Sequence, residues 1–155
     1  MASENEKGFG LLVPLLVIVL AIGGAVWWKL NERWQREAAV IAERAAVAAQ
    51  IAEQQRLLVR WDDARKVANS APRVALSGPV TQLQEVKRAV ERQAASGCLA
   101  RPTRELLSAM GMVIDGFVVF MANQADSRLR STEKFDAAEV VFGRYHALLA
   151  ACAKA

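Results

Sequence analysis

The stretch "PTRELLSAMGMVIDGFVVFMA", residues 102–122, decides the fold class. Apolar residues recur along it at intervals of four and three, which is the spacing of one face of an α-helix. These core positions are Leu106, Met110, Val113, Phe117 and Phe120. Most flanking positions are apolar too, so in the second half of the stretch only the side that carries Asp115 stays polar. A helix this apolar needs several neighbours to cover it, which predicts an all-α fold with an antiparallel bundle of three to four helices.

Two more bundle helices flank this one in the sequence. Residues 133–152 continue an apolar stripe, with Ser131 or Thr132 as the expected N-cap after a polar loop at 123–132. The core positions of this stripe are Phe135, Phe142, Tyr145 and Leu149, together with Ala138 and Cys152. Upstream, the segment 69–80 contains Pro72 and Pro79 and predicts a break, followed by a helix that begins at Pro79 and stops near Ser96.

A run of twenty uncharged residues, "FGLLVPLLVIVLAIGGAVWW", occupies positions 9–28 after a short polar tail at 1–8. As a helix it would be ~30 Å long, the thickness of the hydrocarbon core of a bilayer. Trp27, Trp28 and Lys29 then have the composition of a membrane interface. The run predicts a single transmembrane helix that stays attached as a signal-anchor. A cleaved signal peptide is the alternative, although the run is longer than usual for one.

Residues 29–69 contain neither Gly nor Pro and are rich in strong helix formers. They predict a helical stalk, or the first helix of the bundle, ahead of a bundle domain at 70–155. A narrow apolar seam runs along this segment with alternating intervals of four and three, through Trp34, Ala38, Ile41, Ala45, Ala48 and Ala52. Because most of the seam is alanine, it fits either a thin coiled coil or an exposed tether.

Cys98 and Cys152 are the two cysteines of the chain. Cys98 precedes the helix at 102–122, and Cys152 ends the helix at 133–152. If these two helices pack antiparallel, both cysteines lie at the same end of the bundle, where a disulfide is possible. Two buried thiols are the alternative. A disulfide would place the domain in an oxidising compartment, the periplasm or the cell exterior.

The distribution of basic residues points to the opposite topology. Lys7 precedes the apolar run, whereas Lys29, Arg33, Arg36 and Arg44 follow it. The positive-inside rule would leave the C-terminal domain in the cytoplasm, although this rule weakens when a long domain follows the span. We give more weight to the position of the two cysteines than to this charge distribution. The expected protein is a single-pass protein of the bacterial inner membrane with a periplasmic domain.

The sequence contains no motif that would support catalysis, a cofactor or a metal. The one histidine, His146, lies at the edge of an apolar stripe, and Met110, Met112 and Met121 fit a core better than a cofactor pocket. The net charge of +4 is spread over interspersed acidic and basic residues, so a nucleic-acid partner is not expected. The expected partners are the lipid bilayer and either another envelope protein or a second copy of the chain, as a homodimer.

These features predict a membrane-anchored structural or interaction module of the bacterial envelope, not an enzyme. A ligand-sensing helical bundle is the alternative. The layout, with an N-terminal anchor, a helical domain and two cysteines, also resembles the inner-membrane subunit of phage spanins. That resemblance implies a lysis accessory protein that forms disulfide-linked rods. The apolar half after residue 100 departs from it, because spanin ectodomains are polar coiled coils.

Overall fold

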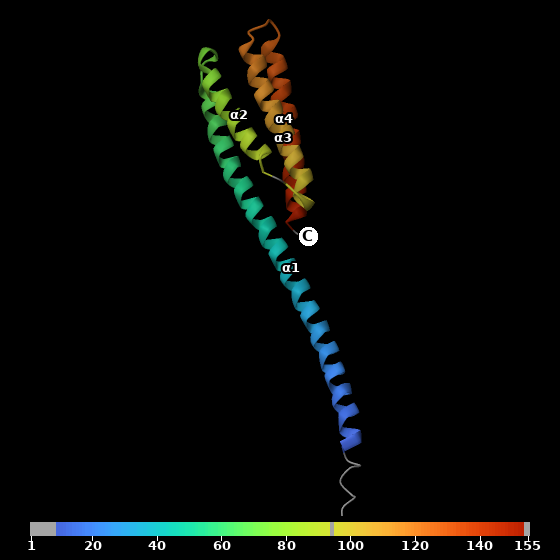
Figure 1. The fold of residues 1–155 in the computed structure, drawn as a ribbon. Coiled ribbons are helices and arrows are strands. Elements are labelled where there is room, and N and C mark those ends of the chain that lie inside the picture. Colours follow the sequence, from blue (N-terminus) through green and yellow to red (C-terminus); the bar gives the residue numbers. More distant parts are fainter. Residues whose placement is uncertain (1–8, 94, 154–155) are drawn as a thin grey trace, which may run out of the picture. The chain divides into compact units, whose positions relative to one another are not determined.

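The computed structural model describes residues 9–93 and 95–153, except that the side chains of residues 9–22, 25 and 26 are not described. Within this part the protein is all-α, as the sequence predicts, and contains no strand. The helices are α1 (Phe9–Ser70), α2 (Ser77–Glu91), α3 (Ala100–Met121) and α4 (Ser127–Cys152), with 3-10 turns η1 (Arg73–Ala75) and η2 (Gly97–Leu99) (Figure 1). The chain divides into two units, Met1–Ala46 and Val47–Ala155.

The first unit contains the N-terminal part of α1. From Lys29 onward this helix has no Gly or Pro to interrupt it, and alanine, the strongest helix former, is its commonest residue. Glu32 and Arg36 form an ion pair one turn apart on its surface. The described side chains of this unit are exposed to solvent.

Among the residues that the structure describes, no helix has both the length and the apolar character needed to cross a bilayer. The backbone of the predicted span, residues 9–28, is helical as part of α1. Most of the side chains on which that prediction depends, those of 9–22, 25 and 26, lie outside the described residues.

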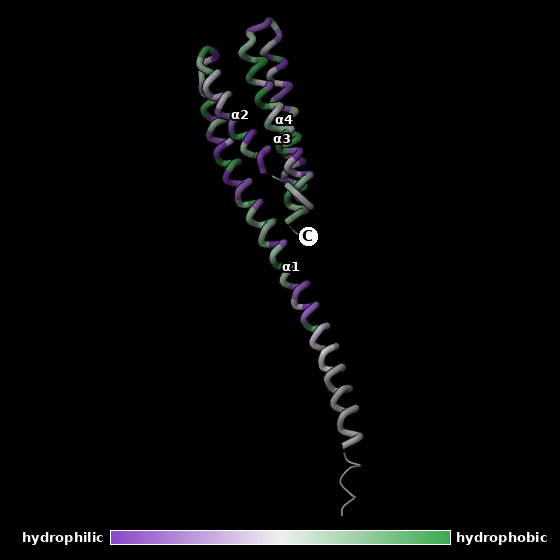
Figure 2. The backbone as a smooth tube through the Cα atoms, in the orientation of Figure 1, coloured by the Kyte–Doolittle hydropathy of each residue, from purple (hydrophilic) through white to green (hydrophobic). Residues whose placement is uncertain are grey.

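The second unit is a helical bundle built from the C-terminal part of α1 together with α2, α3 and α4. One face of α1 is buried in it at intervals of three and four, through Gln54, Leu57, Trp61, Ala64 and Ala68. The helix α2 contributes Val80, Leu83, Val86 and Val90 to the same core. Figure 2 shows hydrophobic residues concentrated along α3, which supplies the largest share of the buried residues.

The helices α3 and α4 form an antiparallel hairpin, and both contribute residues to this core (Figure 1). The predicted loop at 123–132 is too long, because α4 already begins at Ser127. The sequence between Ser127 and Thr132 has no Gly or Pro, and the side chains of Ser127 and Ser131 are buried, so this segment continues the helix. The turn is confined to residues 122–126, where Asn123 adopts a left-handed backbone conformation with φ of 54°.

Candidate functional site

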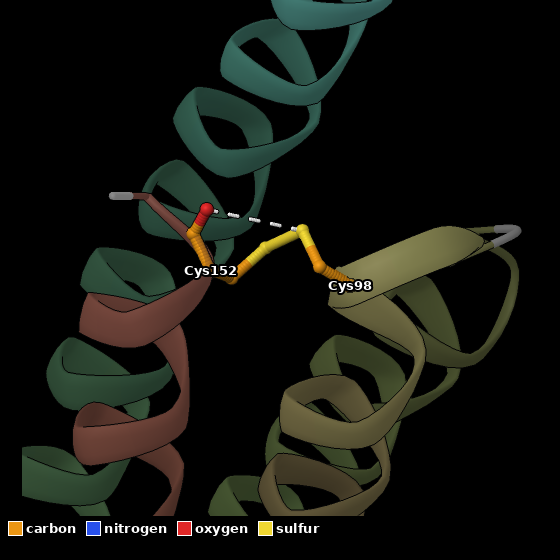
Figure 3. The surroundings of a disulfide bond; sticks show 2 residues. All are labelled: Cys98 and Cys152. Carbon is orange, nitrogen blue, oxygen red and sulfur yellow. Dashed lines mark hydrogen bonds between the residues drawn. A yellow bond between two sulfur atoms is a disulfide. The ribbon is translucent and has the colours of Figure 1, made fainter. Parts of the chain in front are cut away.

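The two cysteines meet at the end of the bundle where α3 begins and α4 ends (Figure 3). Gly97 opens the turn η2 with a positive φ of 57°, which an L-residue with a side chain rarely adopts. This turn directs Cys98 toward Cys152, the last residue of α4. Their Cα atoms are 5.5 Å apart and their sulfur atoms are joined in a disulfide. The predicted pairing is therefore present, and it closes the α3–α4 hairpin covalently.

The disulfide is accessible from one side only. Cys152 is buried, at 8% exposure, whereas Cys98 is exposed. The Sγ of Cys98 lies 3.9 Å from the carbonyl oxygen of Cys152, the contact drawn as a dashed line in Figure 3. A disulfide sulfur carries no hydrogen, so this contact can become a hydrogen bond only in the reduced protein, when Cys98 has a thiol to donate.

A buried hydrogen bond ties α1 to α3 near the disulfide. The Nε2 of Gln54 donates to the Oγ1 of Thr103 over 3.0 Å, and both residues are almost fully buried. An amide buried at this depth is costly unless its hydrogen bonds are made. The bond therefore fixes the register between α1 and the first turn of α3.

A shallow groove of about 370 Å³ opens beside this hydrogen bond. It is lined by α1, by the segment after α2 and by η2, through Ala49, Gln50, Glu53, Gln54, Gln93 and Leu99. Its polar side chains are three glutamine amides and the carboxylate of Glu53, whose Oε2 lies 3.2 Å from the Nη1 of Arg56. The groove therefore offers hydrogen-bond donors and acceptors and one carboxylate.

Of the predicted core positions, the nine with large side chains all contact the bundle core. Six of them are buried, namely Leu106, Met110, Val113, Phe117, Phe142 and Tyr145. The other three, Phe120, Phe135 and Leu149, are half-buried and pack against the same core. The rings of Phe117 and Phe135 meet edge to face across the hairpin, with centroids 5.0 Å apart.

Two buried side chains carry a polar atom without a hydrogen-bond partner among the described residues. These atoms are the Nε1 of Trp61 and the hydroxyl of Tyr145. Burial raises the pKa of Tyr145 to about 12, because the core destabilises the phenolate. Both residues are large contributors to the core and are almost completely shielded from solvent.

The predicted membrane-interface residues lie on the exposed surface of α1. Trp27 is 69% exposed and Trp28 is 70% exposed, and Lys29 is exposed as well. The seam residues Trp34 and Ile41 are exposed to a similar degree. Among the described residues of their own unit, no side chain covers these large apolar groups.

The remaining polar residues singled out in the sequence lie on the surface of the bundle. Asp115 is exposed on α3, and His146 is exposed on α4, where its ring lies 4.9 Å from that of Tyr145. Met110 is buried, and Met112 and Met121 are partly buried and pack against the bundle core. Within the described residues, no group of three or more histidine, cysteine or carboxylate side chains is arranged to hold a metal ion.

Sequence reasoning missed the buried face of α1. Its seam from Trp34 to Ala52 lies on the exposed side, and the bundle face begins instead at Gln54 and continues through Leu57 and Trp61. The sequence does carry a signal for this face, because its residues from 54 to 68 recur at intervals of three and four. It was masked because a glutamine and two alanines occupy three of the five positions.

Comparison of the chain with protein-family models, with curated proteins and with solved structures finds no match.

Proposed function

We propose that this protein is a membrane-anchored helical module of a bacterial envelope, with a disulfide-closed bundle on the oxidising side of the membrane. In this role the bundle is a structural or binding element, held at the membrane by the N-terminal part of α1. Its partner is another envelope protein or a second copy of the chain.

The observation that carries the proposal is the pairing of Cys98 with Cys152. Both cysteines of the chain are used in one intrachain disulfide, and one of its sulfurs belongs to an exposed residue. Structural disulfides persist in oxidising compartments and are rare in the cytosol, where exposed ones are reduced. A chain that relies on this link is therefore suited to the periplasm or the cell surface.

The anchor is supported by the sequence of the segment that precedes the bundle. Twenty consecutive residues without a charge end in two tryptophans, and a lysine follows them. Trp27 and Trp28 are exposed, as side chains at the boundary between headgroups and hydrocarbon would be in the absence of lipid. The described backbone is helical from Phe9 through this boundary and beyond it.

Two alternative functions have weaker support. A spanin-like rod needs cysteines that pair between chains, whereas here the two cysteines pair within one chain. A ligand-sensing bundle needs an enclosed pocket between helices, and the groove beside Gln54 is shallow and open. Neither alternative accounts for the disulfide as directly as the proposed module does.

A reporter fusion tests the topology. Alkaline phosphatase fused after Ala155 folds only in an oxidising compartment, so we expect an active enzyme in intact cells. A cytoplasmic reporter at the same position should be inactive. The reverse result would place the bundle in the cytoplasm and would overturn the proposal. That is the topology that the positive-inside rule predicts from the basic residues after the span.

Thiol labelling tests the disulfide independently of the fusion. Unreduced protein from cells lysed in a maleimide-polymer reagent should show no mass shift, and reduced protein should show two added labels. The variant Cys98→Ser is the matched control, since it should accept one label at Cys152 without reduction once the protein is denatured. Two labels on unreduced wild type would remove the argument for an oxidising compartment.

A further inference from the structure

Three of the large exposed apolar side chains in the first unit lie in one line along α1. Trp27, Trp34 and Ile41 follow one another at intervals of seven residues, and their exposures are 69%, 69% and 67%. Seven residues are close to two helical turns, so side chains at this spacing share one face. A heptad interval of large apolar residues is the pattern of the d positions of a coiled coil.

The positions between these residues complete the heptad. Asn31, Ala38 and Ala45 occupy the a positions, each four residues after one d position and three before the next. Small a residues beside large d residues leave room for tryptophan and isoleucine side chains from a facing helix. We call this face, from Trp27 to Ala45, the α1 seam. It shares Trp34, Ala38, Ile41 and Ala45 with the apolar seam predicted from the sequence.

We propose that two copies of this chain pair in parallel through the α1 seam, with Asn31 of one copy opposite Asn31 of the other. This inference rests on the proposed function in one respect, since it chooses between the two partners named there and assigns the face that binds, but it depends on an exposed face of α1 and not on the membrane. Two copies anchored in one membrane would also have to be parallel, so the two proposals are compatible without depending on each other.

Asn31 determines the choice of a parallel second copy. In a parallel, in-register pair each a residue faces its own counterpart, and two asparagine amides can donate to and accept from each other. In any antiparallel alignment an a residue faces a d residue, and the d residues here are Trp27, Trp34 and Ile41. Asn31 would then be buried against an apolar side chain with its amide unpaired, which is costly.

Charges flanking the seam are compatible with this arrangement. In a parallel pair Glu37, at a g position, faces the e position occupied by Ala42, so no like charges meet. An antiparallel pair would bring Glu37 near Arg44, but an ion pair at the exposed edge of a coiled coil contributes less than an unpaired buried amide costs. Polar complementarity thus favours the parallel pair.

Single cysteines introduced at neighbouring alanines test the proposal in the full chain. Ala38→Cys and Ala45→Cys place thiols at a positions, whereas Ala39→Cys and Ala46→Cys place them one residue further, outside the seam. A short bismaleimide added to cells or membranes links two thiols that face each other and leaves the native disulfide untouched. We expect a covalent dimer for Ala38→Cys and Ala45→Cys, and its loss for Ala39→Cys and Ala46→Cys.

Other patterns would overturn the proposal. Monomers for all four variants would show that the seam does not pair, and a cross-linked product of another mass would identify a different protein as its occupant. A dimer formed only when Trp34→Cys and Ala45→Cys are present in the same chain would show antiparallel pairing. Co-expression of two differently tagged copies confirms that a dimer contains two copies of this chain.

A second pair of variants tests the role of Asn31. Asn31→Asp, introduced together with Ala38→Cys, should abolish the cross-linked dimer at neutral pH, because it sets two carboxylates against each other. Ala39→Asp in the same background adds an equal charge outside the seam and should leave the dimer intact. Equal dimer yields from the two variants would overturn the assignment of Asn31 to the interface.

The dimer and the anchor can fail separately. An anchored but monomeric protein would contradict only the dimer, and a dimer free of the membrane would contradict only the anchor.

Discussion

The ring of Phe135 in α4 occupies the space beside Gly116 in α3 that a methyl group would need. A Cβ built on Gly116 would lie 2.6 Å from the Cε1 of Phe135, closer than real contacts of this kind. The same ring meets Phe117 edge to face. Gly116 therefore permits the close approach of the two helices, and Phe135 cannot move away without losing its contact with Phe117.

The variant Gly116→Ala is expected to destabilise the bundle. Alanine is a better helix former than glycine by about 1 kcal/mol, but forcing the ring aside should cost about 1–3 kcal/mol, so the free energy of unfolding should fall or at best stay level. Denaturant unfolding followed by circular dichroism measures it. Gly143→Ala is the matched control, because nothing lies within 4 Å of its Cβ, and it should gain stability. Equal gains for both variants would contradict the argument.

Loss of the disulfide should weaken the bundle by a larger amount. Cys98 and Cys152 are 54 residues apart, and the chain-entropy model gives about 4 kcal/mol for a loop of this size. We expect Cys98→Ala to lower the free energy of unfolding by this order, and reduction of the wild type to have nearly the same effect. Reduction should leave the stability of Cys98→Ala unchanged. A variant as stable as the oxidised wild type would show that the link is dispensable to the fold.

Much of the bundle was predictable because α3 is so apolar. A helix with the stripe from Leu106 to Phe120 needs neighbours, and a short connection to the next apolar helix makes the pair antiparallel. That geometry places Cys98 and Cys152 at one end of the hairpin. The structure confirms both the all-α bundle and the disulfide. The prediction needed only the helical period and the order of elements along the chain.

Other features depend on tertiary contacts that the pattern does not encode. The face of α1 that enters the bundle begins with Gln54, whose buried amide donates to Thr103 from a helix far away in sequence. The helix α4 begins at Ser127, and Ser127 and Ser131 are buried. The sequence does not predict this burial, because serine is mostly an exposed residue. Sequence reasoning could assign neither, because in both cases a polar residue is buried by the tertiary fold.

The bond between Gln54 and Thr103 can be tested with a nearly isosteric change. Thr103→Val removes the acceptor and leaves the buried amide of Gln54 without this partner, which should cost about 1–3 kcal/mol of unfolding free energy. Thr132→Val is the control, since Thr132 is exposed and its hydroxyl donates to the carbonyl of Arg128 within the same helix. That variant should change stability little. If both variants lose the same amount, the cost comes from valine in a helix and not from the buried bond.

Tyr145 should make the stability of the bundle fall in alkaline solution. Its pKa is about 12 in the folded protein and 10.0 as a free side chain, so between these values the unfolded chain loses a proton that the folded chain retains. The contribution of Tyr145 to stability is therefore complete below pH 10 and is lost as the pH rises toward 12, by about 1.4 kcal/mol per pH unit. Since other groups also titrate there, the quantity to measure is the difference in unfolding free energy between wild type and Tyr145→Phe.

At neutral pH the variant Tyr145→Phe should be as stable as wild type or slightly more so, because the hydroxyl has no partner within the described residues. Above pH 10 the difference in unfolding free energy in favour of the variant should grow with pH. A difference that stays constant from pH 8 to pH 12 would mean that the phenol ionises in the folded protein as readily as in water, which a side chain with 0% exposure should not do.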